Sequence, residues 1–579
     1  MRTIDKNTIQ SYQNHIYTQE KSQNTIDKYI RDIRTFTAWL QTQELDNWTK
    51  NVLQNFVSLH KNIEENYEVD MEEQNQVARK LENESAVLLK NNSVLPIGKE
   101  KKVIIIGELA RQMRFQGGGS SHIQPTKMTN AIEAIREKGY QVTYIQGYQN
   151  ETEELGEKQL QDTIEKLKQE YRKKDCVILY FIGLTESYEG EGYDRKNLKI
   201  PQNQEELLDE IAETVGKNHI AAISFGGAPM DFSFEKNVGA ILHMYLGGQA
   251  VGESVADLIS GEVNPSGKLA ETIPFSEKDT PAWRYFAPPN DDVEYRESIF
   301  VGYRYYETFH VPVKYPFGYG LSYTSFSYSE LNVPEVYSGG KIQIRFKIKN
   351  IGKVSGSEIA QLYVCPNESD VIRSHIELKG FQKIYLHPGE EKEVILELDE
   401  RSFSVYDVEK KAFSMLSGKY QICIGASVHD LQLKANMEVV GNSYFRNERE
   451  LFPDYFREQP HGMEISAEQF YQLLGGEPKH DKEKKRGEYT VYDSYQDVVN
   501  VSMFGKIVRG VVHIGLKIIL RGKSERDPAF KMVKMGVEEG NLEGLIATSG
   551  GIATPKLIDM LVYNANKKYL QALKRLLKK

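Results

Sequence analysis

The chain has 579 residues, of which 40% are hydrophobic and 27% charged, and its formal net charge is −9. That length is too great for one hydrophobic core and indicates three or four domains. The modest negative charge argues against nucleic acid as the main partner. Cys176, Cys365 and Cys423 are too few and too far apart for a disulfide framework or a metal cluster, so we expect no metal and no other cofactor.

Residues 1–45 are predicted to be helical. An apolar stripe at helical spacing follows a possible cap at Ser22 or Asn24. The stripe consists of Ile26, Ile30, Ile33, Phe36, Trp39 and Leu40, with Lys28, Arg31 and Arg34 on the other side. The first six residues contain no apolar run, so we expect no secretory signal and a cytoplasmic location.

Residues 46–97 are predicted to be a helical connector. The helical pattern continues from Trp48 to about Arg79, and the apolar stretch 84–91 leads to Pro96. Because proline cannot continue a helix, we expect the helical run to end there.

Residues 98–280 alternate between apolar runs and helical stretches. The runs 103–107, 177–183 and 220–226 are typical of buried parallel strands. Helical stretches at 128–138, 160–173 and 205–215 lie between or beside them. This alternation predicts a doubly wound α/β layer, in which ligands bind beyond the carboxyl ends of the strands. Gly183 and Gly226 mark two of those ends.

The segment from Tyr188 to Pro201 follows one of these strand ends and has several charged residues close together. Glu189, Glu191, Asp194 and Arg195 lie within seven residues, and a glycine stands on each side of Glu191. Glycines permit a tight loop that lifts a side chain into a cleft, and a partly desolvated carboxyl there could act as a general acid. Asp194 and Arg195 could form a charge-assisted pair beneath it. The alternative interpretation is a solvated acidic turn.

The remainder divides into a linker, a β domain and a tail. We expect residues 281–325 to be a linker that wraps the α/β layer. Residues 326–440 show period-two alternation and regularly spaced turns, which predict a β-sandwich. Residues 441–579 begin as a charged linker and end in helices.

The stretch Ile507–Leu520 is the best candidate for a membrane segment, and it is too short to span one. Lys506, Arg509, His513 and Lys517 recur every three or four residues on one side. We therefore expect an amphipathic helix packed on the protein, and no membrane partner.

Several motifs in order resemble the second half of glycoside hydrolase family 3, the β-glucosidase family. The resemblance runs from about residue 47 to 440, and the helical tail is similar to an extension of some bacterial members. The motifs are Glu84–Asn91 (ESAVLLKN), Gln116–His122 (QGGGSSH), Glu191–Arg195 (EGYDR), Leu246–Gln249 (LGGQ), Asn264–Thr272 (NPSGKLAET), Ile299–Tyr306 (IFVGYRYY) and Pro316–Tyr323 (PFGYGLSY).

The resemblance implies a retaining glycosidase and the roles of several residues. In that family a (β/α)8 barrel precedes an α/β sandwich and a fibronectin type III-like domain, and the sandwich loop carries the acid/base glutamate. Carried over, that residue is Glu191, with Glu189 as its rival and Glu186 as a weaker one. The implied substrate-binding residues are Gly118, Ser120, Ser121, His122, Asp194 and Arg195. The implied partner is a β-linked glycoside or oligosaccharide.

The sequence departs from the family in its first part. A (β/α)8 barrel needs about 250 residues, and only 46 or so precede the matching region. The family's nucleophilic aspartate lies in a Ser-Asp-Trp context, and none of Trp39, Trp48 and Trp283 follows Ser-Asp. We therefore expect an α/β sandwich, a fibronectin type III-like domain and helical ends, without a barrel and without a nucleophile.

The N-terminal stretch Ser22–Leu40 resembles the core-binding domain of tyrosine recombinases. Recombinase catalytic residues in a matching order are absent downstream. Three hypotheses follow: a β-glucosidase-type hydrolase, a non-catalytic remnant or a subunit that needs a barrel-bearing chain, and a DNA-binding fusion that uses residues 1–45. The net charge and the partial domain argue against the third.

Overall fold

The computed structural model describes most of the chain after residue 69. The described residues are 70–172, 175–193, 195–286, 293–367, 369–441, 447–478, 484–520, 527–549 and 551–577. The chain divides into two compact units, Met1–Gln74 and Asn75–Lys579. The expectations for residues 1–45 and for the start of the connector lie outside the described residues.

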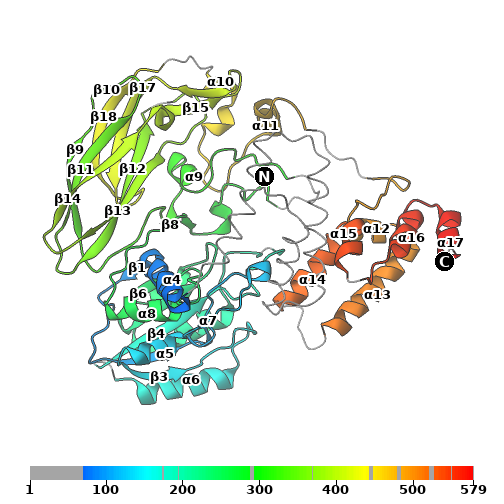
Figure 1. Ribbon diagram of the computed structural model, residues 1–579, viewed down its shortest axis with the longest axis horizontal. Helices are drawn as coiled ribbons and strands as arrows, with labels where there is room; N and C mark the ends of the chain where they lie inside the picture. The colour runs from blue at the N-terminus through cyan, green and yellow to red at the C-terminus, as the bar shows by residue number, and fades with distance from the viewer. Residues whose placement is uncertain are drawn as a thin grey trace, which may run out of the picture. The chain divides into compact units, whose positions relative to one another are not determined.

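A mixed six-stranded sheet forms the centre of the first described domain (Figure 1). Its strand order is β1-β6-β5-β4-β2-β3, and every pairing is parallel except that of β1 with β6. The strands are β1 (Val87–Asn91), β2 (Lys102–Ile106), β3 (Gln141–Ile145), β4 (Cys176–Gly183), β5 (Ile220–Phe225) and β6 (Ala240–His243). The predicted α/β layer is confirmed, with its three apolar runs as the central strands β2, β4 and β5.

Helices cover both faces of this sheet. They are α4 (Met71–Ser85), α5 (Ala131–Glu137), α6 (Glu157–Glu170), α7 (Gln202–Val215) and α8 (Val251–Ser260). Helix α5 contacts α8, whereas α6 contacts α7. The crossover through α5 runs from β2 to β3, and the crossover through α6 runs in the opposite direction along the sheet, from β3 past β2 to β4. Because both crossovers are right-handed, the two helix pairs lie on opposite faces of the sheet. The central strands β4, β5 and β6 are almost entirely buried, as in other parallel sheets, whereas the edge strand β3 is partly exposed.

The expected helical run through residues 84–97 is wrong. Helix α4 ends at Ser85, and Val87–Asn91 forms the edge strand β1. A short continuous apolar run fits a buried strand as well as a buried helix, so its periodicity could not decide between them.

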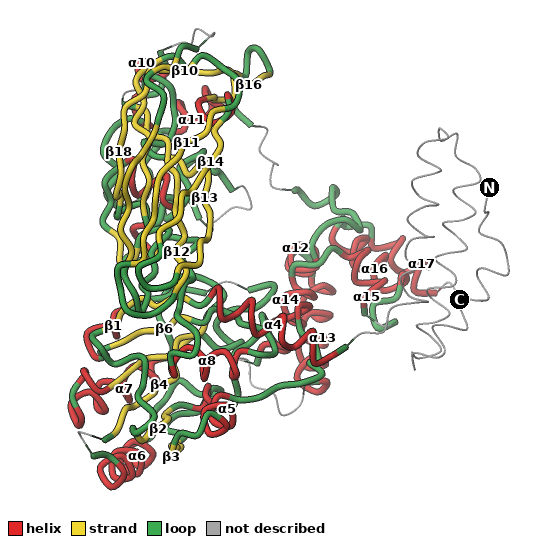
Figure 2. Tube along the Cα trace, turned by 60° about the vertical axis from the view of Figure 1, so that its left-hand side comes forward, coloured by secondary structure: helices red, strands yellow, loops and turns green. Residues whose placement is uncertain are grey.

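A β-sandwich follows, as predicted (Figure 2). One sheet has the order β10-β18-β17-β12-β13 and the other β14-β11-β9. Ile344, Phe346 and Ile348 of β11 face its core, at the period of two seen in the sequence. The strands are β9 (Phe326–Asn332), β10 (Val336–Tyr337), β11 (Ile342–Asn350), β12 (Gly356–Pro366), β13 (Glu377–Leu386), β14 (Glu391–Leu398), β17 (Gly418–Gly425) and β18 (Leu431–Val439), with the hairpin β15 (Ser404–Asp407) and β16 (Ala412–Met415) beside them.

The remaining short elements lie within the two domains, between them and at the start of the tail. They are η1 (Glu108–Ala110), η2 (Gly119–Ser121), η3 (Lys217–His219), η4 (Ser233–Asn237), β7 (Ile273–Pro274), η5 (Glu277–Asp279), α9 (Tyr303–Thr308), β8 (Val313–Tyr315), η6 (Glu400–Phe403), α10 (Glu448–Leu451), η7 (Pro453–Tyr455) and α11 (Ala467–Leu474). The two strands β7 and β8 pair with each other.

The tail ends in a helical subdomain with its own core. Its helices are α12 (Tyr495–Asn500), α13 (Met503–Ile519), α14 (Pro528–Glu538), α15 (Leu542–Thr548), α16 (Pro555–Ala565) and α17 (Tyr569–Leu577). Val498, Val499, Leu542, Ile558 and Leu561 form the centre of that core. Within the described part of the chain, no helix has the length and apolar character needed to cross a bilayer.

Candidate functional site

The loop after β4 presents Glu191 at the tip of a tight turn. Gly190 and Tyr193 pair as a β-bridge, so Glu191 and Gly192 occupy the two positions between them. Gly192 has φ = +88°, a conformation that a side chain would strain. The Tyr193 hydroxyl donates a hydrogen bond to the Glu186 carbonyl oxygen and closes the loop on itself. Glu191 is exposed to solvent at this tip.

The glycine-rich segment 117–121, to which the resemblance assigns substrate-binding residues, contacts this loop. A Cβ atom on Gly119 would lie 2.7 Å from the Glu191 Cβ and 2.9 Å from its Oε2. A Cβ on Gly118 would lie 3.2 Å from the Gly190 Cα. Only glycine therefore lets the two backbones approach so closely, and this approach sets the position of Glu191.

Arg114 holds the base of the loop. Its side chain is 3% exposed, and its guanidinium lies 3.3 Å from Glu186 Oε1 and 3.6 Å from Glu189 Oε1. It also donates a 3.2 Å hydrogen bond to the Glu189 carbonyl oxygen. Sequence reasoning missed Arg114, because nothing local in its segment indicates a contact 75 residues away.

The three carboxylates of this loop have different surroundings. Glu189 is 14% exposed, and its Oε1 accepts a 2.7 Å hydrogen bond from the Gly227 N–H. Glu186 pairs with Arg114 and lies 2.9 Å from His122 Nε2. Both therefore anchor the base of the loop, whereas Glu191 lies at its tip, beside Gly119.

The remaining predicted residues have mixed outcomes. His122 contacts Glu186 and so joins the two loops, whereas Ser121 Oγ donates a 3.4 Å hydrogen bond to the Gly118 carbonyl oxygen within its own segment. Asp194 and the side chain of Ser120 lie outside the described residues, and with them the predicted pair with Arg195. Arg195 donates a 2.7 Å hydrogen bond to the Pro229 carbonyl oxygen.

A second acidic group lies near Arg195. Burial raises the pKa of Glu271 to about 6, and Tyr245 and Arg195 oppose that rise. The Tyr245 hydroxyl and Glu271 Oε1 are both buried. Glu271 belongs to the motif Asn264–Thr272, and its environment gave no signal in the sequence.

Helix α14 of the tail also contacts the loop. The Lys531 ammonium donates a 2.5 Å hydrogen bond to the Ser187 carbonyl oxygen and lies 4.7 Å from the centre of the Tyr193 ring. A cavity of about 750 Å³ lies between the loop and α14, with Tyr193 and Lys196 on one side and Phe530, Lys534, Met535 and Glu538 on the other. Within the described residues, no group of three or more His, Cys, Asp or Glu side chains is placed to hold a metal.

Known families match this region. Residues 86–323 match the glycosyl hydrolase family 3 C-terminal domain. Residues 358–428 match a fibronectin type III-like domain, and residues 9–65 match the phage integrase N-terminal SAM-like domain. The loop of Glu191 and the segment of Gly118 both lie within the first match.

The curated relatives are glycosidases. A thermostable β-glucosidase B from Acetivibrio thermocellus is 41% identical over 384 residues, which are 65% of this chain and 50% of that protein. An exo-α-(1→6)-L-arabinopyranosidase from Bifidobacterium breve is 36% identical over 388 residues, again 65% of this chain and 50% of the relative. The chain thus spans about half the length of these relatives.

Solved structures of glycosidases also match the chain. A family 3 β-glucosidase from Bifidobacterium adolescentis matches with a TM-score of 0.64 and 33% identity, over 73% of this chain and 61% of that one. β-Glucosidase 3B from Thermotoga neapolitana, solved in complex with α-D-glucose, matches with a TM-score of 0.58 and 30% identity, over 65% and 56%.

Proposed function

We propose that residues 75–441 are the proton-donating half of a retaining glycosidase, with Glu191 as the acid/base group and a β-linked glycoside or oligosaccharide as the substrate. The position of Glu191 carries this proposal. Glu191 lies exposed at the tip of a loop beyond a parallel strand end, where ligands of α/β layers bind. The neighbouring Glu186 and Glu189 are held by Arg114.

We also propose that this chain is catalytically incomplete by itself. Retaining hydrolysis uses two carboxyl groups about 5–5.5 Å apart, one as nucleophile and one as proton donor and then base. The 579 residues contain no Ser-Asp-Trp sequence to supply the nucleophile. A barrel-bearing chain would supply it, and a non-catalytic remnant is the alternative.

Exposed apolar side chains near the domain junction support a missing partner. They concentrate in the described residues of segment 283–301, and such groups often mark an interaction surface. These side chains are Trp283, Phe286, Val293, Tyr295, Ile299 and Val301.

Reconstitution tests the proposal. The purified chain is mixed with the barrel region of the Acetivibrio thermocellus relative, and hydrolysis of nitrophenyl β-glucoside and cellobiose is measured. We expect turnover only in the mixture. Glu191→Gln should reduce cellobiose turnover by about 10²–10⁴-fold, because general acid catalysis contributes that much. The nitrophenyl substrate should lose less, since nitrophenolate leaves without a proton.

Glu210→Gln is the matched control, because it removes the same charge from an exposed position on α7. Turnover by the chain alone that disappears in Glu191→Gln would contradict incompleteness. Unchanged turnover by the Glu191→Gln mixture would contradict the acid/base assignment.

A second candidate function is DNA binding through residues 9–65. The match to the integrase SAM-like domain favours it. Salt-dependent binding to duplex DNA, weakened by replacing Lys28, Arg31 and Arg34 with glutamine, would support this function. We expect no such binding at physiological salt, since the chain carries a net negative charge.

A further inference from the structure

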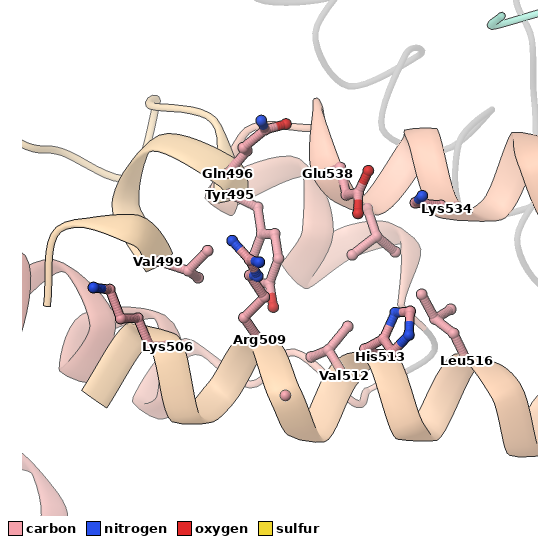
Figure 3. Close-up of a pocket in the computed structure, with 12 residues that line it drawn as sticks. Tyr495, Gln496, Val499, Lys506, Arg509, Val512, His513, Leu516, Lys534 and Glu538 are labelled. Carbon is pink, nitrogen blue, oxygen red and sulfur yellow. The ribbon is translucent and has the colours of Figure 1, made fainter. Parts of the chain in front are cut away.

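A cavity in the helical subdomain has no assigned role. It has a volume of about 580 Å³ and lies between α12, α13 and α14. Figure 3 shows Arg509 and His513 extending from α13 toward Tyr495 and Glu538, which come from α12 and α14. Small-molecule sites commonly have volumes of about 300–1,000 Å³. None of the three family matches extends into this subdomain, because the last of them along the chain ends at residue 428.

The lining of this cavity carries excess positive charge. Lys506, Arg509 and Lys534 line it together with His513, and Glu538 is the only carboxylate among its lining residues. Without His513 the lining has three positive charges and one negative charge, a net of +2. Within the described part of the chain, neither Lys506 nor Lys534 forms an ion pair that would neutralise it.

The position of two of these cations on α13 increases the imbalance. The 17 residues of α13 include no Asp or Glu, and Lys506 and Arg509 lie in its first two turns. The amino-terminal end of a helix carries partial positive charge that falls off within the first turn, so it disfavours Lys506 more than Arg509 and favours an anion near that end. An anionic ligand in the cavity would therefore relieve repulsion that the chain does not relieve itself.

Two further groups shape the cavity. Asn500 Oδ1 accepts a 2.6 Å hydrogen bond from Arg509 Nη1, which orients the guanidinium and leaves its other N–H groups available. Tyr495 is 5% exposed, and burial raises its pKa to about 12, with Arg509 and Glu538 both close enough to act on it. Val499, Val512 and Leu516 supply an apolar wall.

We propose that this cavity binds a small phosphate-bearing compound, such as a sugar phosphate. Arg509 offers the forked donor geometry that suits phosphate, and Lys506 and Lys534 add charge. A phosphate dianion matches the net charge of the lining. The cavity is larger than a phosphate needs, so the apolar wall faces the rest of the ligand. This inference goes beyond the proposed function, because it uses no residue of the Glu191 loop.

Calorimetric titration of the full chain tests the proposal. The probes are glucose 6-phosphate, inorganic phosphate and glucose. We expect binding of glucose 6-phosphate that weakens as salt increases, and none of glucose. Arg509→Gln and Lys506→Gln should each weaken binding about tenfold, the usual effect of losing a hydrogen bond to a charged group. Both positions are exposed, so the variants should fold.

Lys517→Gln is the control, because it removes the same charge from an exposed position of α13 that does not line the cavity. Absence of binding by both phosphate compounds at millimolar concentration would overturn the proposal. An equal loss in Lys517→Gln would also overturn it, since it would show diffuse attraction to the helix instead of a site.

The phosphate could be carried by a soluble compound or by a lipid headgroup. Exposed apolar residues follow a different face of α13 from the one that lines the cavity, namely Met503, Ile507, Val511, Ile514 and Ile518. Co-sedimentation with phosphatidic acid vesicles distinguishes the sources. We expect no co-sedimentation at physiological salt. The proposal of a soluble ligand would be overturned if the chain bound vesicles but not glucose 6-phosphate, and if Arg509→Gln abolished the vesicle binding.

Discussion

The Lys531 ammonium lies 4.7 Å from the centre of the Tyr193 ring and also donates a hydrogen bond to the Ser187 carbonyl oxygen. Tyr193 and Ser187 stand on opposite sides of Glu191 in the chain. A single side chain from α14 therefore fastens both ends of the turn that presents Glu191. The tail thus contributes to the order of a loop that lies within the family 3 match.

Lys531→Met should loosen this loop. The charged hydrogen bond and the cation–π contact together are expected to contribute about 2 kcal/mol, so amide protection of residues 186–193 should fall at least tenfold. Hydrogen exchange followed by mass spectrometry measures this directly. Lys531→Arg should restore most of the protection, and Lys517→Met should leave it unchanged. Equal protection in Lys531→Met and the wild type would show that α14 does not hold the loop.

Arg114→Met should destabilise the domain by about 2–3 kcal/mol. The substitution keeps the apolar stem and leaves Glu189, which is 14% exposed, without its cation. Glu186 is more exposed and is expected to contribute less. Urea unfolding measures the change, with Arg111→Met as an exposed control. A loss below about 0.5 kcal/mol would contradict an anchoring role.

The sequence predicts the parts of the fold that depend on local pattern. The central strands β2, β4 and β5 are recognisable because parallel strands buried on both faces are continuously apolar. Strand β3 was missed because it lies at the sheet edge and its residues are half exposed. Strand β1 was taken for helix because its apolar run fits either structure.

Some residues of the candidate site could likewise be predicted from the sequence, and others could not. Gly118 and Glu191 belong to recognisable motifs, and the structure brings the two motifs together where Gly119 approaches Glu191. Arg114 and Lys531 could not be found, since each contacts the loop from a distant part of the chain with no motif of its own. Tertiary contacts of this kind leave no periodic signal in a sequence.

Gly183→Ala should strongly destabilise the α/β layer, although it adds only one methyl group. Gly183 has φ = +145°, and an added Cβ would overlap the backbone of Phe225 on the neighbouring strand β5. Backbone cannot move aside as a flexible side chain can, so we expect a loss of more than about 3 kcal/mol. Gly216→Ala is the control, because its φ is +85° but open space surrounds it. That variant should lose only about 1 kcal/mol, and equal losses would show that strain alone matters.

Glu82→Gln should stabilise the protein in mildly alkaline solution. The Glu82 carboxyl is 6% exposed and packed beneath Gly247, and its Oε1 has no hydrogen-bond partner among the described residues. Burial raises the pKa of Glu82 to about 8, with a weak opposing contact from Ser85. The folded state therefore binds more protons than the unfolded state between about pH 4.5 and 8, and stability falls as pH rises through this range.

The size of the effect follows from the same pKa difference. Between pH 5 and 8 the wild type should lose on the order of 3 kcal/mol relative to Glu82→Gln, whose amide does not titrate. Urea unfolding at pH 5, 6, 7 and 8 measures both proteins, and Glu84→Gln serves as a control that is more exposed on the same helix. If the free energies of unfolding of the wild type and Glu82→Gln changed equally with pH, the Glu82 carboxyl would ionise in the folded protein without loss of stability. In that case water or a cation must reach Glu82 beneath Gly247.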